Sequence, residues 1–154
     1  MYLENGVIPP LDTSFKRNLF TTFLTYTDFS SLFPFRLKSM SDDRGRFVEV
    51  IRSNSQGQVS ISYTNVGVTR GNHFHTRKVE RFAVVEGKAK IELRRIGEAT
   101  KYSFVLNGDS PEFIDIPVWY THNITNIGDS ILLTVFWINE HYNELDPDTY
   151  FENV

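Results

Sequence analysis

Cysteine is absent from the 154-residue sequence, which excludes disulfide bonds, thiolate metal sites and cysteine nucleophiles. Because disulfides accumulate in oxidising compartments, this absence favours a cytoplasmic location. The sequence also lacks an apolar run of the roughly 20 residues that a membrane-spanning helix needs. Its first residues combine an early glutamate with Pro9 and Pro10, so they do not resemble the apolar core of a signal peptide. We therefore expect no membrane association.

A basic surplus is missing as well. The chain holds 16 lysine and arginine residues against 19 aspartate and glutamate residues, which gives a net charge of −3. Nucleic-acid binders show a basic face, so this balance argues against a nucleic-acid partner. The sequence contains no G-x-G-x-x-G loop, and it therefore offers no dinucleotide-binding fold of the kind that a reductase uses.

The sequence changes character near residue 35. Before that point, Asp12 or Thr13 is placed to cap a helix that extends to about Tyr26, because both side chains accept hydrogen bonds from free backbone N–H groups. We divide the chain into a lead-in with this helix (1–35) and a second unit (36–154). One face of the helix is apolar, and we expect it to pack on the rest of the chain, with docking to another subunit or domain as the alternative. This apolar stripe consists of Phe15, Leu19, Phe20, Phe23 and Leu24.

From Phe47 onward, polar and apolar residues alternate in short runs between glycine-containing turns, a pattern typical of strands with one wet face. Many short strands at regular spacing, without a second helical region, predict an all-β antiparallel sandwich or barrel. The expected strands are 47–52, 59–63, 79–85, 88–94, 102–106, 113–116, 121–125 and 131–138. We expect the acidic and aromatic tail after Ile138 to lie over the barrel or over its neighbour.

Three histidines and one glutamate have the spacing of a metal site. His73 and His75 are two residues apart, so on a strand both project to the same face. Glu80 follows after a gap that suits a turn into the next strand, and His122 follows a turn bounded by Pro117. Three imidazoles and one carboxylate suit zinc, nickel, iron(II) or manganese, and the residues alone do not choose among these divalent ions.

These residues resemble the first motif of the cupin superfamily. That motif, G-x5-H-x-H-x4-E-x6-G, is matched at Gly67, His73, His75, Glu80 and Gly87. The resemblance implies a cupin double-stranded β-helix, a jelly-roll barrel, with the short N-terminal helix in front of it. It also implies that the ligands hold one divalent metal inside the barrel, and that two copies pair as a homodimer through exchanged or abutting strands.

A second segment resembles the other cupin motif, with one departure that concerns the entrance of the barrel. The match rests on Gly108, Pro117, His122 and Asn126, but the spacer between Gly108 and Pro117 is longer than usual. Trp119 stands where cupins usually have glycine, which eases a tight turn. We expect Trp119 either to be strained or to line the entrance and stack on a substrate ring.

A closer resemblance covers most of the chain, from about Ser41 to the end. The segments Asp42–Gly45, Gly71–His75, Pro117–Asn126, Phe136–Glu140 and Asp146–Phe151 are similar to the C-terminal cupin of CapF-type capsular polysaccharide enzymes. This resemblance implies zinc-dependent C3 epimerisation of a UDP-linked 6-deoxy-4-keto amino sugar. In that family a short-chain dehydrogenase half precedes the cupin and reduces the C4 ketone, and residues 1–35 resemble its end. We expect either a C-terminal part of such an enzyme or a free-standing epimerase.

Epimerisation beside a ketone requires a group that removes the α-proton and returns it on the other face. A divalent cation stabilises the charge that develops on the enolate oxygen. Tyr120 is the first candidate for the acid or base and Tyr63 the second, with packing at the barrel mouth as the alternative for Tyr120. His122 or Glu80 is a further candidate if the metal does not occupy it.

A UDP-sugar brings phosphate charges to an acidic protein, so local cations are needed. Arg70 lies nearest the ligand strand and is expected to contact phosphate or sugar. Lys78 is a second substrate-binding candidate, with a solvated outer face as the alternative. Arg81 alternates with Glu80 and Phe82, which favours the solvated outer face for Arg81.

Three other functions remain open at this point. A related nucleotide-sugar cupin, a 3,4-ketoisomerase or a 3,5-epimerase, would use the same kind of cavity. An iron-dependent dioxygenase would use the same ligand set. A non-catalytic cupin would bind a sugar or join subunits, with the metal in a structural role.

Overall fold

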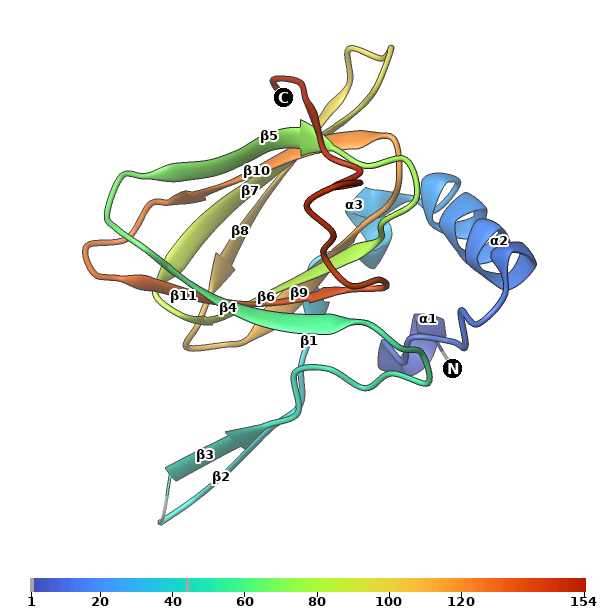
Figure 1. The fold of residues 1–154 in the computed structure, drawn as a ribbon. Coiled ribbons are helices and arrows are strands. Elements are labelled where there is room, and N and C mark those ends of the chain that lie inside the picture. The colour runs from blue at the N-terminus through green and yellow to red at the C-terminus, as the bar shows by residue number, and fades with distance from the viewer. Residues whose placement is uncertain (1, 44) are drawn as a thin grey trace.

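The computed structural model describes residues 2–43 and 45–154, and its strands form two facing antiparallel sheets (Figure 1). The first sheet contains, in spatial order, β1 (Phe35–Arg36), β9 (Glu112–Ile116), β6 (Glu80–Glu86), β11 (Leu132–Ile138) and β4 (Gln58–Thr64). The second contains β12 (Tyr150–Phe151), β5 (Thr69–Phe74), β10 (Tyr120–Asn126), β7 (Lys88–Arg95) and β8 (Lys101–Asn107). Most spatial neighbours are not successive in sequence, as in a jelly-roll barrel, and the predicted all-β fold is confirmed.

A two-stranded hairpin projects from this barrel (Figure 1). It pairs β2 (Ser39–Asp42) with β3 (Gly45–Val48), and Arg44 lies outside the described residues. The strand predicted over 47–52 is therefore wrong in its second half, since β3 ends at Val48.

The N-terminal segment explains why β3 stops early. The Ile8 N–H donates to the Arg52 carbonyl at 3.0 Å, and the Asn54 N–H donates to the Ile8 carbonyl at 2.9 Å. These backbone groups hydrogen-bond to each other. Such pairing is favourable, since a buried peptide group without a hydrogen-bond partner costs free energy. The chain after Val48 thus follows the N-terminal segment instead of extending the hairpin.

Three helices precede the barrel strands: α1 (Tyr2–Asn5), α2 (Ser14–Thr25) and α3 (Phe29–Leu32). The predicted helix is confirmed as α2, and its N-cap is Thr13, whose hydroxyl oxygen accepts from the Lys16 N–H at 3.2 Å. In the described part of the chain, no helix combines the length and apolar character needed to cross a bilayer.

The apolar stripe of α2 is divided between two environments. Phe20 and Leu24 are buried against the barrel, whereas Phe15 and Leu19 are 74% and 58% exposed. The expected packing of the stripe on its own chain is therefore met by only part of it, because the helix turns its first two apolar side chains away from the sheets.

Aromatic side chains from the N-terminal segment complete the core. Phe29 of α3 is buried with its ring centroid 5.2 Å from that of Tyr120 and 5.3 Å from that of Tyr102. Burying such rings contributes roughly 1.5–3 kcal/mol each. This packing joins α3 to the second sheet and fills that part of the space between the sheets.

The expectation that Arg81 lies on a solvated outer face is wrong. The Arg81 guanidinium is 1% exposed and donates to both carboxylate oxygens of Asp115, at 2.6 and 2.7 Å. It also donates to the Gly6 carbonyl, and the Tyr2 hydroxyl donates to Asp115 at 2.5 Å. The N-terminal segment covers this face of the sheet, so alternation along β6 gives two buried faces instead of one.

We expect Asp115→Ala to lower the free energy of unfolding by about 3–5 kcal/mol, because it leaves the buried Arg81 charge without its partner. Urea denaturation followed by circular dichroism measures this change. Glu112→Ala on the same strand is the matched control, since its partner Arg36 is 77% exposed at 3.7 Å and such pairs contribute less than about 1 kcal/mol. Equal losses in both variants would contradict the account of this pair.

Candidate metal centre and substrate cavity

Four candidate ligands converge between the sheets. His73 lies on β5, His75 follows that strand, Glu80 begins β6 and His122 lies on β10. His122 and His73 face each other in the register of β10 and β5, and Glu80 enters from the opposite sheet. The four side chains each offer a ligand atom, and these atoms all lie within 4.8 Å of one another.

An irregularity in β5 shapes this part of the site. The register of β5 and β10 shifts between His122 and Asn123, next to Gly71, whose φ is 102°. A Cβ on Gly71 would lie 2.7 Å from the His122 carbonyl oxygen, so only glycine fits this close approach. Asn72 also has a positive φ of 60°, and its side-chain oxygen accepts from Asn123 at 3.1 Å. This bulge sets how His73 meets His122.

The ring nitrogens of two histidines are oriented by backbone carbonyls. The Nδ1 atom of His75 faces the Asp148 carbonyl oxygen in a short contact, and Nδ1 of His122 faces the Tyr120 carbonyl oxygen at 3.2 Å. A carbonyl only accepts, so in both rings Nδ1 carries the proton and Nε2 presents a lone pair. Ring orientation of this kind is usual for histidines that ligate metals.

The lone pairs meet the carboxylate of Glu80. Its Oε2 atom lies 2.9 Å from Nε2 of His122 and 3.3 Å from Nε2 of His75. All three atoms are buried and have no hydrogen-bond partner among the described residues. Two acceptors at this distance require a proton or a cation between them. The residues present therefore fit a divalent metal that accepts three imidazoles and one carboxylate.

Burial and close contact shift the pKa values of three of these groups. Burial, assisted by the neighbouring His122, lowers the pKa of His73 to about 4, so its imidazole is neutral near neutral pH. Burial by itself would raise the pKa of Glu80, but the close imidazoles of His122 and His75 lower it below its usual range. Burial also disfavours the charged form of His75, yet contact with Glu80 outweighs it and the pKa of His75 is raised. The site thus holds an ionised carboxylate among imidazoles.

A cavity of about 730 Å³ opens beside this cluster. It lies between β4, at the edge of one sheet, and β5, near the edge of the other, with β6, β10 and β11 behind it. His73, Glu80 and His122 form part of its wall. A volume in this range accommodates a drug-sized ligand or cofactor.

Two of the predicted substrate-site residues line this cavity. Arg70 is on β5, exposed, and reaches the wall near His73. Tyr63 is on β4, is 69% exposed and lines the same cavity. The structure therefore brings Arg70 and Tyr63 together with three of the four candidate ligands.

Tyr120, the first candidate acid or base, lies elsewhere. Its side chain is 4% exposed, packs against Phe29 and is absent from the cavity wall. Burial raises the pKa of its hydroxyl. The alternative of plain packing describes Tyr120 correctly, because α3 covers that part of the barrel and shields the ring from the cavity.

Trp119 occupies the conformation that the missing glycine would have taken. Its φ is 64°, and its N–H donates to the His75 carbonyl oxygen at 2.8 Å. Its ring is half-exposed and stacks on Phe74 with centroids 5.7 Å apart. Phe74 points to the opposite face of β5 from its neighbour His73, so Trp119 is not part of the cavity wall. The tight turn is thus maintained, but the tryptophan stacks on the protein itself.

Lys78 contacts the C-terminal tail. Its side chain is buried, and Nζ donates to the Pro147 carbonyl oxygen at 2.5 Å. The ammonium lies 5.5 Å from the ring centroid of Tyr142, which does line the cavity. The structure gives Lys78 no direct place in the cavity, since the tail lies between them.

Several cavity residues went unnoticed in the sequence. The tail contributes Tyr142, whose N–H donates to the Gln58 side chain at 3.1 Å, and β4 contributes polar side chains. Alternation along β4 was a usable signal, because the inward positions of that strand carry small polar residues where a closed core would carry apolar ones. These residues are Gln58, Ser60 and Ser62.

Known proteins with similar sequences and structures identify the family of this chain. The family described as "Polysaccharide biosynthesis C-terminal domain" matches residues 40–150. A Pseudomonas aeruginosa protein, "UDP-2-acetamido-2,6-beta-L-arabino-hexul-4-ose reductase", is 36% identical over 134 residues, which cover 87% of this chain and 36% of that protein. The structure of "capsular polysaccharide assembling protein CapF" from Staphylococcus aureus is 42% identical with a TM-score of 0.64, over 96% of this chain and 40% of that chain.

A more distant structure has the same fold. The dTDP-6-deoxy-D-glucose-3,5-epimerase RmlC from Legionella pneumophila is 20% identical with a TM-score of 0.60, over 70% of this chain and 66% of that chain. This likeness supports the cupin jelly roll and nothing finer. The chain spans about two fifths of the length of the reductase and CapF, at 36% and 40%.

Proposed function

The chain belongs to the polysaccharide biosynthesis C-terminal domain family, and we propose that it is a metal-dependent epimerase acting at C3 of a UDP-linked 6-deoxy-4-keto amino sugar. The observation that carries this proposal is the convergence of His73, Glu80 and His122 on the wall of a cavity that Arg70 and Tyr63 also line. The Pseudomonas relative is named for a UDP-linked acetamido hexul-4-ose, which is a sugar of the proposed class.

The reaction sets clear demands on the cavity. The proton on C3 is acidic because the neighbouring C4 carbonyl can take up the charge as an enolate. A divalent cation held by His73, His75, Glu80 and His122, with zinc as the first choice and nickel, iron(II) or manganese as alternatives, supplies a Lewis acid for that oxygen. The chain's own residues must bind the nucleotide sugar, exclude water and transfer the proton.

Tyr63 is the residue we assign to proton transfer. It lies at the rim of the cavity on β4, where it follows the inward-facing Ser62 and is 69% exposed, so its hydroxyl can meet a sugar only at the cavity edge. General acid–base catalysis of this kind contributes about 10²–10⁴-fold to a rate. Tyr142 lines the same cavity from the tail and is the second candidate.

Arg70 is the residue we assign to the phosphates of UDP. Its guanidinium carries a fixed charge at the exposed rim, where a diphosphate can form paired hydrogen bonds with it. The small polar side chains of β4 then face the sugar. Ser60 and Ser62 supply hydroxyl groups that can hydrogen-bond to it in either direction.

Two assembly properties belong to the same proposal. We propose that two copies form a homodimer, for which the projecting hairpin and the exposed Met40 and Phe47 offer apolar surface. We further propose that a short-chain dehydrogenase, as a domain or as a separate protein, reduces the product. The length of the relatives supports this partner, since each is more than twice as long as this chain.

Arg70→Ala is expected to raise KM for the UDP-sugar by about tenfold or more, because a hydrogen bond between charged groups contributes roughly 1.5–3 kcal/mol. Steady-state kinetics at two salt concentrations measures this. The wild-type KM should rise with salt, and that of the variant should rise less. Arg95→Ala removes the same charge outside the cavity and is the matched control. Equal KM values for Arg70→Ala and wild type would remove Arg70 from the substrate site.

Incubation with the 4-keto sugar in deuterated water tests the proposed reaction against its alternatives. Deuterium at C3 alone, seen by nuclear magnetic resonance, supports the proposal. Deuterium also at C5 identifies a 3,5-epimerase, and a migrated ketone identifies a 3,4-ketoisomerase. Oxygen uptake with iron would indicate a dioxygenase. No exchange in a protein that metal removal merely destabilises would indicate a non-catalytic cupin.

A further inference from the structure

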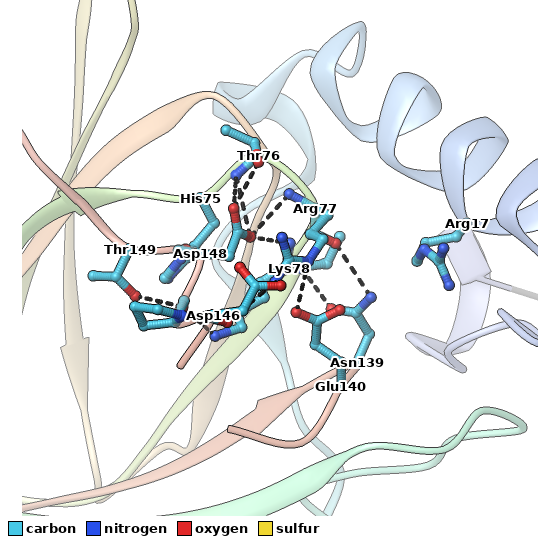
Figure 2. A network of polar contacts seen from close by, with 12 residues as sticks. Arg17, His75, Thr76, Arg77, Lys78, Asn139, Glu140, Asp146, Asp148 and Thr149 are labelled. Atoms are coloured by element: carbon cyan, nitrogen blue, oxygen red, sulfur yellow. Dashed lines mark hydrogen bonds and ion pairs between the residues drawn. The ribbon is translucent and has the colours of Figure 1, made fainter. Parts of the chain in front are cut away.

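The C-terminal tail (residues 139–149) crosses from the end of β11 back to β5 and is fixed on the turn that joins two candidate metal ligands (Figure 1 and Figure 2). That turn, residues 76–79, begins directly after His75 and ends directly before Glu80. The contacts between tail and turn therefore bear on where both ligands lie. Asp148 makes more of these contacts than any other residue of the tail.

The Asp148 carboxylate caps the turn. It accepts from the Thr76 N–H at 3.1 Å, the Arg77 N–H at 3.0 Å and the Lys78 N–H at 3.2 Å, and from the Thr76 hydroxyl at 2.6 Å (Figure 2). Three successive backbone donors on one carboxylate fix the path of the turn.

The backbone of the same residue holds the ligand itself. The Asp148 carbonyl oxygen accepts from Nδ1 of His75, which leaves Nε2 of that ring facing Glu80. Asp148 adopts a φ of 42°, a conformation that aspartate and asparagine tolerate better than most residues. One residue thus orients the His75 ring with its carbonyl and the chain after His75 with its side chain.

Residues that precede Asp148 also secure the tail on the turn. Arg77 donates to Glu140 at 3.1 Å and to Asp146 at 2.7 Å, and the Lys78 ammonium donates to the Pro147 carbonyl (Figure 2). Arg77 and Lys78 both lie in the turn, so the two charges that precede Glu80 attach the tail and do not line the cavity.

We propose that Asp148 is a positioning residue for the metal centre, which fixes the tautomer of the His75 ring and the path from His75 to Glu80. This inference rests on the metal binding in the proposed function. Residues that orient metal-ligating histidines typically change metal affinity by about 10- to 100-fold when they are replaced. The C-terminal tail is then a component of the metal centre, although it supplies no ligand.

The test is the zinc affinity of the full chain, measured by competition with a chromophoric chelator. Asp148→Ala removes the cap and is expected to weaken zinc binding by about 10-fold or more. Cobalt(II) substituted for zinc should show an altered visible spectrum in the variant. In the metal-free protein, two-bond ¹H–¹⁵N spectra should show Nδ1 of His75 fully protonated in wild type and only partly protonated in the variant.

Glu144→Gln is the matched control, because it removes the charge of an exposed acidic side chain of the same tail that, in the described part of the chain, does not hydrogen-bond to the turn. It should leave the zinc affinity and the cobalt spectrum unchanged. If Asp148→Ala shows no cooperative unfolding transition, Asp148→Asn decides, since asparagine tolerates the backbone conformation but turns an N–H donor toward the turn. We expect it to weaken zinc binding as well.

The outcomes separate this inference from the function on which it rests. A wild-type chain that binds no divalent metal overturns the metal proposal and this inference with it. A wild-type chain that binds zinc tightly, with folded Asp148 variants of equal affinity, spectrum and Nδ1 protonation, overturns the role of Asp148 alone.

Discussion

Replacing His122 by alanine is expected to weaken zinc binding by more than the roughly 100-fold that the loss of an orienting residue costs, because it removes a ligand outright. His122 is fully buried, its Nε2 atom lies 2.9 Å from Glu80, and it has no hydrogen-bond partner at that nitrogen among the described residues. Zinc content after gel filtration and chelator competition measure the loss. Epimerase turnover should disappear with the metal.

Two further variants make this result specific. Glu80→Gln keeps the shape of the side chain but removes its charge, so it should also lose most of the zinc. His141→Ala replaces the one histidine outside the cluster, which is exposed, and should bind zinc like the wild type. Stoichiometric zinc in a folded His122→Ala protein would contradict the proposed ligand set.

Tyr63→Phe is expected to lower kcat by about 10²-fold or more, with little change in KM, because it removes only the hydroxyl that transfers the proton. Tyr120→Phe should retain activity, because that hydroxyl is shielded from the cavity by the packing around Phe29. Tyr142→Phe should have a smaller effect than Tyr63→Phe, since Tyr142 enters the cavity from the tail. Steady-state kinetics on the same substrate measures all three.

The opposite ranking would be decisive. An inactive but folded Tyr120→Phe, together with a fully active Tyr63→Phe, would mean that the acid or base acts from the buried side of β10. Tyr63 would then no longer be the residue assigned to proton transfer.

The convergence of the candidate ligands and the all-β class were predictable from local spacing, whereas the jelly-roll barrel was implied by the resemblance to cupins. Two histidines at alternate positions of a strand share a face in any sheet, and a glutamate after a short turn returns to the same point. Helix α2 was predictable for the same reason, since its cap lies next to its first turn. Such features require no knowledge of what packs against them.

The failures all concern partners that are distant in sequence. The sequence predicts that Arg81 points outward from β6 into solvent. The N-terminal segment, with Tyr2 and Gly6, covers that side of the strand and buries it. Tyr120 is predicted to lie at the entrance of the barrel, but α3 packs over it. Lys78 is predicted to contact the substrate, but the tail covers it and accepts its hydrogen bond. Alternation predicts on which side of a strand a residue lies, but it does not predict which other segment packs against that side.

Among the cavity residues, too, those near the ligand strand were predictable and those from distant segments were not. Arg70 and Tyr63 were identifiable because they flank the ligand strand or its neighbour. Tyr142 was not, because it reaches the cavity through a tail without regular secondary structure that is held by side-chain contacts. No periodicity marks such a segment in the sequence.

Exchange of the C3 proton with solvent, measured with and without metal, tests the central claim most directly. The chain is stripped of metal with a chelator, reloaded with one equivalent of zinc, and incubated with the UDP-linked 4-keto sugar in deuterated water. We expect deuterium at C3 only in the reloaded protein and no exchange at C5. Equal C3 exchange in the stripped and reloaded proteins, or none in a reloaded protein that holds its zinc, would contradict the proposed metal-dependent epimerisation.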